Sequence, residues 1–227
     1  MGIKLQLLDK ENKIYLLDDD NFDFPSLDMM DDDLVALGGN FHPQRLINAY
    51  KNGLFPWFID ELGYIHWYSP QKRMVLKPDE FRLTKSLKRV IKNKGFKIKS
   101  NQNFEAVIKN CATIKRKDED SSWIDDNFIK AYSYLYEIGY AYSIECYLDN
   151  ELVGGLYGVM IDDIFCGESM FSKVSNASKV VFYHLCDQAK QNGIRLIDCQ
   201  VYNEHLKSLG AYEITRDEYF RYLKGSL

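Results

Sequence analysis

The sequence lacks the features that mark membrane, secreted and zinc-binding proteins. It contains no run of 18 uncharged apolar residues, and residues 1–6 do not form a signal peptide. Its cysteines have no short paired spacing and lie within apolar segments, as reduced, buried thiols do. They are Cys111, Cys146, Cys166, Cys186 and Cys199. We therefore expect a cytoplasmic protein with no metal site and no membrane contact.

Basic residues are missing from one segment and acidic residues from another. No Lys or Arg occurs between Asp18 and Asp33, whereas no Asp or Glu occurs between Phe81 and Phe104. The net charge of −4 argues against nucleic-acid binding over the whole surface, but the basic segment could hold a phosphate backbone locally. A plain solvated face is the alternative explanation for the basic segment, and it is our expectation for the acidic one.

The composition, with 46% apolar and 27% charged residues, is that of an ordinary globular protein. A helix is predicted between Pro43 and Gly53, because proline favours the first helical position and glycine the position past the end. The aromatic segments 53–58 and 66–70 are interrupted by proline, so we expect them to be irregular. A boundary near residue 70 would separate a small N-terminal domain, residues 1–70, from a second domain, residues 71–227.

The apolar periodicity after residue 71 predicts helices, a meander of three strands, a crossover helix, a further strand and a short helix. The first three helices are expected over residues 84–93, 103–112 and 126–138, and the meander strands over 140–148, 152–160 and 164–170. The crossover helix follows over residues 176–192, the further strand over 195–201 and the short helix over 204–209. A crossover helix implies one parallel strand pair. The expected fold class is α/β (α+β), with a GNAT acetyltransferase-like mixed sheet in the C-terminal domain.

Glycine is absent from the connection between the third meander strand and the crossover helix. Acetyl-CoA enzymes of this fold carry a glycine-rich loop there, whose backbone amides bind pyrophosphate. Residues 171–178 contain no glycine. No cofactor is therefore expected, and an acyl-CoA acetyltransferase is the weaker alternative.

Asp198 and Gln200 are polar residues within an otherwise apolar predicted strand. Regular alternation would place both on one face and Ile197 and Cys199 on the other. Burying an amide without a hydrogen-bond partner costs roughly 2–7 kcal/mol. The two residues therefore either brace a loop or form a site at the carboxyl end of the strand, where open α/β sheets bind ligands.

Seven segments of the chain together resemble the leucyl/phenylalanyl-tRNA–protein transferase family. They are residues 34–40 (LVALGGN), 53–58 (GLFPWF), 67–70 (WYSP), 122–124 (SWI), 152–158 (LVGGLYG), 165–172 (FCGESMFS) and 196–201 (LIDCQV). The resemblance spans about residue 34 to the C-terminus. It implies transfer of Leu or Phe from aminoacyl-tRNA (Leu-tRNA or Phe-tRNA) to the N-terminal Arg or Lys of acceptor proteins, which marks them for N-end rule degradation.

The resemblance implies that Asp198 and Gln200 are catalytic. An aminoacyl ester is already activated, and positioning alone can contribute roughly 7–11 kcal/mol, so neither a nucleophile nor a metal is needed. A neutral amide is a very weak base, so we expect Gln200 to orient the incoming amine and Asp198 to orient Gln200. Water or the tRNA ribose hydroxyl would take the proton. Glu168 would hold the donor α-amino group, unless it is a structural partner of a backbone donor.

The resemblance also implies a donor pocket and tRNA contacts. The pocket would be formed by Leu156, Phe165, Met170, Phe182, Leu185 and Ile197, each of which could equally be core. Related chains commonly carry Met at the position of Leu156, and such a pocket discriminates by only about 1–3 kcal/mol per methylene, so methionine is a third candidate donor.

Two tryptophans and four basic residues are the implied tRNA contacts. Trp57 and Trp123 match tryptophans that lie against the terminal adenosine, a stacking interaction worth about 1–3 kcal/mol. Ordinary packing is the alternative for both and the expectation for Trp67. Candidates for the tRNA backbone are Lys85, Lys88, Arg89 and Lys92. Two rivals that share the tRNA substrate are a peptidoglycan-branching enzyme, which lacks these segments, and a non-catalytic tRNA-binding module.

Overall fold

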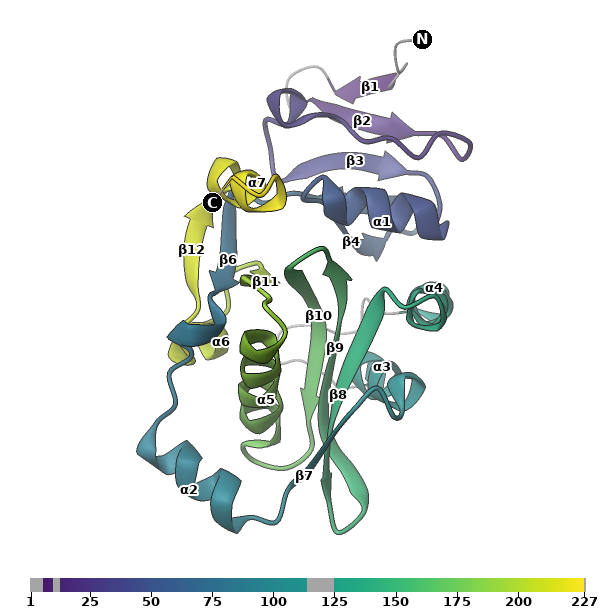
Figure 1. The fold of residues 1–227 in the computed structure, drawn as a ribbon. Helices are drawn as coiled ribbons and strands as arrows, with labels where there is room; N and C mark the ends of the chain where they lie inside the picture. Colours follow the sequence, from purple (N-terminus) through teal and green to yellow (C-terminus); the bar gives the residue numbers. More distant parts are fainter. Residues whose placement is uncertain (1–5, 10–12, 114–124, 227) are drawn as a thin grey trace. The chain divides into compact units, whose positions relative to one another are not determined.

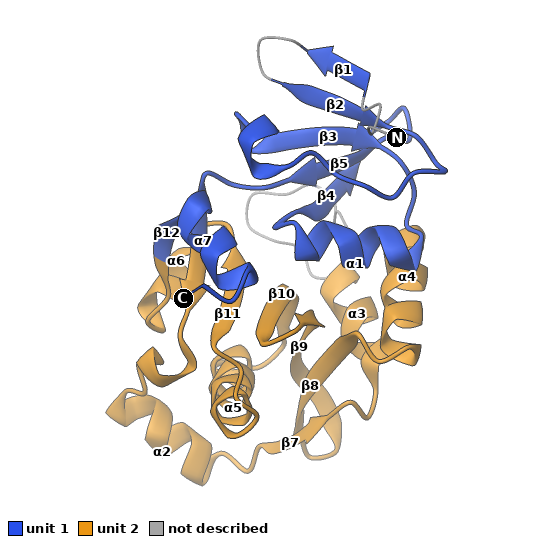
Figure 2. Ribbon diagram, turned by 45° about the horizontal axis from the view of Figure 1, so that its top comes forward, with its two compact units in different colours: residues 1–73, 213–227 blue, residues 74–212 orange. Residues whose placement is uncertain are grey.

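The computed structural model describes residues 6–9, 13–113 and 125–226 (Figure 1). The chain divides into two compact units, of which unit 1 comprises Met1–Arg73 and Glu213–Leu227, and unit 2 comprises Met74–Tyr212 (Figure 2). The sequence-based division placed residues 213–227 with the second domain. In the structure this segment belongs to unit 1, which is therefore built from both ends of the chain.

Unit 1 contains a five-stranded sheet with the strand order β1-β2-β3-β5-β4. The strands are β1 (Gln6–Asp9), β2 (Ile14–Leu17), β3 (Leu34–Gly38), β4 (Phe55–Ile59) and β5 (Ile65–Tyr68), and helix α1 spans Pro43–Lys51. The prediction of irregular structure for residues 53–58 and 66–70 was wrong, because both segments contain strands. Proline is tolerated in β4 since β4 is an edge strand, and its register on β5 shifts between Pro56 and Phe58.

Trp67 belongs to the core of unit 1. Its side chain is fully buried, its Nε1 donates a hydrogen bond of 2.8 Å to the Gly38 carbonyl, and its ring meets Phe24 edge-on at 5.0 Å. This environment fits the packing role expected for Trp67.

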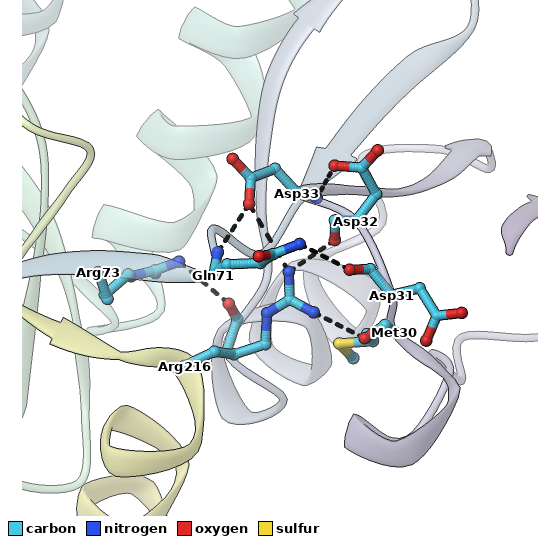
Figure 3. Close-up of polar contacts among 8 residues, drawn as sticks. Met30, Asp31, Asp32, Asp33, Gln71, Arg73 and Arg216 are labelled. Carbon is cyan, nitrogen blue, oxygen red and sulfur yellow. Dashed lines mark hydrogen bonds and ion pairs between the residues drawn. The ribbon is translucent and has the colours of Figure 1, made fainter. Parts of the chain in front are cut away.

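The C-terminal helix α7 (Arg216–Leu223) is held to the acidic segment of unit 1 by Arg216 (Figure 3). The buried guanidinium donates hydrogen bonds to the carbonyl oxygens of Met30 (2.8 Å) and Asp32 (2.6 Å), and it lies 3.8 Å from the Asp33 carboxylate. The Asp33 carboxylate also accepts from the Gln71 backbone N–H at 2.7 Å. Asp31, Asp32 and Asp33 are all exposed, as expected of solvated surface, but their segment also anchors the C-terminal helix.

The second sheet has seven strands in the order β12-β6-β11-β10-β9-β8-β7; unit 2 contains β7 to β11 and most of β6, whereas most of β12 belongs to unit 1. The strands are β6 (Lys72–Leu76), β7 (Lys97–Ser100), β8 (Ala141–Leu148), β9 (Glu151–Ile161), β10 (Ile164–Ser172), β11 (Leu196–Gln200) and β12 (Tyr212–Thr215). Strands β8, β9 and β10 form the antiparallel meander, and β11 pairs in parallel with β10 after a crossover helix. The predicted mixed α/β class and the GNAT-like order of elements are confirmed.

Helices cover both faces of the unit 2 sheet (Figure 1). The helices are α2 (Lys85–Asn93), α3 (Phe104–Thr113), α4 (Asp126–Glu137), α5 (Ala177–Gln191) and α6 (Glu204–Ser208). A Cβ on Gly154 would lie 2.7 Å from Ala177 of α5, whereas a Cβ on Gly155 would lie 3.2 Å from Val107 of α3. Because neighbouring residues of a strand face opposite ways, α5 and α3 cover opposite faces.

Helix α4 lies on the same face as α3, since Tyr132 of α4 and Phe104 of α3 both meet the ring of Tyr157 edge-on at 5.7 Å. The buried residues of α4 are Phe128, Tyr132 and Leu135, which form its apolar stripe. Among the described helices, none is long and apolar enough to cross a bilayer.

Candidate active site

The parallel pairing of β10 and β11 ends early, and the polar residues of the site follow that point. Pairing runs from Ile164 opposite Leu196 to Cys166 opposite Asp198. The register of β10 on β9 then shifts between Gly167 and Ser169, and the register of β11 on β6 shifts between Asp198 and Gln200. Glu168 lies within the first bulge. Bulges of this kind re-aim side chains beside active sites.

Gln200 has a left-handed backbone, with φ of 63°. A residue other than glycine in this region is strained by about 1–3 kcal/mol and persists only when its surroundings hold it. The Asp198 carboxylate does so by accepting a hydrogen bond of 2.9 Å from the Gln200 backbone N–H. The regular alternation expected for residues 198–200 is therefore interrupted, and Asp198 orients the Gln200 backbone.

Glu168 joins the two strands where their backbone pairing has ended. Its Oε1 accepts from the Gln200 side-chain Nε2 at 2.8 Å, and its Oε2 accepts from the Tyr132 hydroxyl at 3.1 Å. Asp198 is fully buried, while Glu168 and Gln200 are 8% and 9% exposed. Because a carboxylate accepts hydrogen bonds, the amide NH2 of Gln200 faces Glu168, and this fixes the direction of its carbonyl oxygen. These bonds offset the cost of burying the polar groups.

Tyr132 is a member of this network that the sequence analysis missed. It lies in the apolar stripe of α4, and its side chain is fully buried. The signal was its hydroxyl, since a buried tyrosine O–H needs a hydrogen-bond partner.

The six residues expected to form the donor pocket lie together. Leu156, Phe165, Phe182, Leu185 and Ile197 are buried in one apolar cluster beneath α5, and Met170 packs against it half-exposed. The cluster therefore lies on the α5 face of the sheet, whereas Tyr132 approaches Glu168 from the α4 face.

The expected tRNA contacts lie in different parts of the chain. Trp57 is half-exposed in unit 1, where its ring meets Tyr68 edge-on at 4.8 Å. Trp123 lies outside the described residues. The four basic candidates Lys85, Lys88, Arg89 and Lys92 are all exposed on α2, and none forms an ion pair with a described residue. Within the described ranges, no three His, Cys, Asp or Glu residues gather where they could hold a metal ion.

Known proteins resemble both parts of the chain. Residues 75–224 match the family model described as leucyl/phenylalanyl-tRNA protein transferase, and residues 39–71 match the model of its N-terminal domain. A protein of this name from Flavobacterium psychrophilum is 49% identical over 85% of this chain and 91% of its own. Another, from Flavobacterium johnsoniae, is 47% identical over 93% of this chain and 99% of its own.

Solved structures match with lower similarity. The crystal structure of FemX is 11% identical and covers 76% of this chain and 66% of its own, with a TM-score of 0.47. A GCN5-related N-acetyltransferase from Kribbella flavida is 10% identical over 63% of this chain and 53% of its own, with a TM-score of 0.39. The family models and the curated relatives, which cover most of the chain, show that it belongs to the leucyl/phenylalanyl-tRNA–protein transferase family.

Proposed function

We propose that this aminoacyltransferase moves Leu or Phe from aminoacyl-tRNA to the N-terminal Arg or Lys of acceptor proteins and so marks them for N-end rule degradation. The observation that carries the proposal is the buried network of Tyr132, Glu168, Gln200 and Asp198 at the end of the β10–β11 pairing. Use of charged tRNA would place the reaction in the cytoplasm.

The network supplies the two orienting groups that the reaction needs. Glu168 would hold the α-amino group of the donor, because a buried carboxylate favours a neighbouring ammonium. The carbonyl oxygen of Gln200, turned away from Glu168 by the amide's own hydrogen bond, would accept a hydrogen bond from the attacking amine. The lone pair of that amine would then face the ester carbonyl, and positioning of this kind can supply about 7–11 kcal/mol. Asp198 is a positioning residue that holds Gln200 in its strained conformation.

The donor side chain would occupy the apolar cluster beneath α5. With its amino group at Glu168 and its side chain in the cluster, the donor would lie across the point where β10 and β11 stop pairing. The aromatic and branched members of the cluster favour Leu and Phe. Methionine is a further candidate, because a purely apolar pocket separates side chains of similar size by only about 1–3 kcal/mol.

The tRNA would be held by stacking and by charge. Trp57 and Trp123 would stack on the terminal adenosine, and the four basic residues of α2 would contact phosphates of the acceptor stem. Neither interaction depends on the bases of the tRNA body, which suits an enzyme that selects its donor by the amino acid.

The test is to mix Leu-tRNA with four peptides that differ only in the first residue, Arg, Lys, Asp or Met. Transfer to the Arg and Lys peptides alone supports the proposal. Transfer to Asp alone would identify a different acceptor class, and intact ester with every peptide would leave only a tRNA-binding module. Heat released on titration with coenzyme A would instead favour an acetyltransferase.

Two variants separate the proposed roles in this assay. Gln200→Ala should lower the transfer rate with little change in affinity for charged tRNA, because the amide acts on the acceptor amine. Trp57→Ala should weaken tRNA binding about 5- to 150-fold, the equivalent of one stacking interaction. An unchanged rate in the Gln200 variant would remove that residue from the mechanism.

A further inference from the structure

The segment that follows Gln200 carries a small group of side chains that already holds a cation. The Lys207 ammonium donates a hydrogen bond of 2.9 Å to the Tyr202 hydroxyl, lies 3.8 Å from the Glu204 carboxylate and stands 5.2 Å from the centre of the Tyr202 ring. The Tyr202 hydroxyl also donates to the Glu204 carboxylate. An aromatic face beside a carboxylate is a favourable environment for an ammonium or guanidinium group.

The backbone keeps this group close to Gln200. Gln200 pairs with Met74 of β6, and the Asn203 backbone N–H points to the sulfur of the same Met74 at 3.2 Å. The chain after Gln200 therefore stays beside Met74. The Asn203 side chain then caps α6 by accepting from the backbone N–H groups of His205 and Leu206. Tyr202 is only two residues from Gln200, so their Cα atoms are at most about 7 Å apart.

The group is also open to solvent. Tyr202 is 44% exposed, and the side chains of Glu204 and Lys207 are 78% and 58% exposed. Ion pairs this exposed contribute little to stability, so another cation can replace Lys207 at small cost. Glu204 and Lys207 lie three residues apart on α6, the spacing at which helix side chains meet.

We propose that Tyr202 and Glu204 bind the cationic side chain of the acceptor's first residue, and that Lys207 occupies this site when no acceptor is present. The inference rests on the proposed function and locates its acceptor specificity. Lys and Arg carry their charge several bonds from the α-amino group. The amine can therefore lie at Gln200 while the charge reaches Tyr202 and Glu204. Lys207 is then an internal competitor of the acceptor.

Two substitutions in full-length protein test the proposal through steady-state transfer of Leu to an Arg-terminated peptide. Glu204→Gln should raise the KM for the peptide about two- to fivefold, the effect of losing one exposed ion pair. Lys207→Gln should lower it by a similar factor, because the competing cation is gone. Neither change should alter kcat or the KM for Leu-tRNA. Exposed residues of α4 provide the matched controls, Glu137→Gln and Lys130→Gln.

The opposite shifts distinguish a binding role from a structural one. Both substitutions break the same Glu204–Lys207 pair, so a purely structural role would move KM in the same direction in both variants. Equal shifts, or shifts no larger than those of the α4 controls, overturn the proposal while wild-type transfer to the Arg peptide still supports the proposed function. Absence of wild-type transfer overturns both.

Discussion

Replacement of Arg216 by alanine should selectively destabilise unit 1. The guanidinium donates to two carbonyl oxygens, those of Met30 and Asp32, and its Nε has no hydrogen-bond partner among the described residues. Hydrogen bonds from a charged donor are each worth about 1.5–3 kcal/mol, and the substitution leaves both acceptors without that donor. The Asp33 carboxylate is 52% exposed, so its ion pair adds less than about 1 kcal/mol. We expect a loss of about 3–6 kcal/mol in the free energy of unfolding.

Urea unfolding followed by tryptophan fluorescence measures this loss. Trp57 and Trp67, two of the three tryptophans, lie in unit 1, and Trp67 is fully buried there. Arg221 is an exposed arginine on the same helix, so Arg221→Ala is the matched control and should change stability by no more than about 0.5 kcal/mol. If Arg216→Ala costs no more than Arg221→Ala, the hydrogen bonds to residues 30 and 32 do not stabilise unit 1.

Two further predictions concern unit 2. Gly154→Val should lower the free energy of unfolding by about 1–3 kcal/mol or more, and with it the melting temperature, because even a Cβ at this position would lie 2.7 Å from Ala177. The control is Gly139→Ala, where a Cβ meets no atom within 4 Å and only the positive φ is unfavourable. Equal melting temperatures in wild type and Gly154→Val would contradict the close packing of β9 on α5. Burial raises the pKa of the Cys186 thiol to about 12 and that of Cys146 to about 11. Both thiols should therefore stay protonated at pH 8 and react with a thiol reagent only when the protein unfolds, whereas half-exposed Cys199 should react first. Mass spectrometry of the labelled peptides gives the order of reaction, and early labelling of Cys186 would refute the prediction.

The sequence predicted unit 2 well, because its signals are local. The helix expected over residues 176–192 is α5 (Ala177–Gln191), and the strand expected over 195–201 is β11 (Leu196–Gln200). Apolar periodicity and the flanking glycine and asparagine residues define such elements without reference to the rest of the chain. Strands β4 and β5 were missed because pairing in the sheet overrides the unfavourable presence of proline.

The details of the site depend on contacts between residues far apart in the sequence. Tyr132 and Glu168 are 36 residues apart, and Glu168 and Gln200 are 32 apart. The bulges that hold Glu168 and Gln200 arise from pairing with β9 and β6, which no local pattern encodes. The sequence could therefore single out Glu168, Asp198 and Gln200 as candidates, but could not show that the Asp198 carboxylate accepts from the Gln200 backbone N–H.

The composition of unit 1 from both chain ends has a consequence for folding during synthesis. A ribosome makes Met30, Asp32 and Asp33 early, but Arg216 only after the whole of residues 74–212. Domains usually fold in the order in which they emerge. The hydrogen bonds of Met30 and Asp32 to Arg216 can therefore form only after unit 2 has been synthesised, so this part of unit 1 completes its interactions after residues 74–212 have emerged.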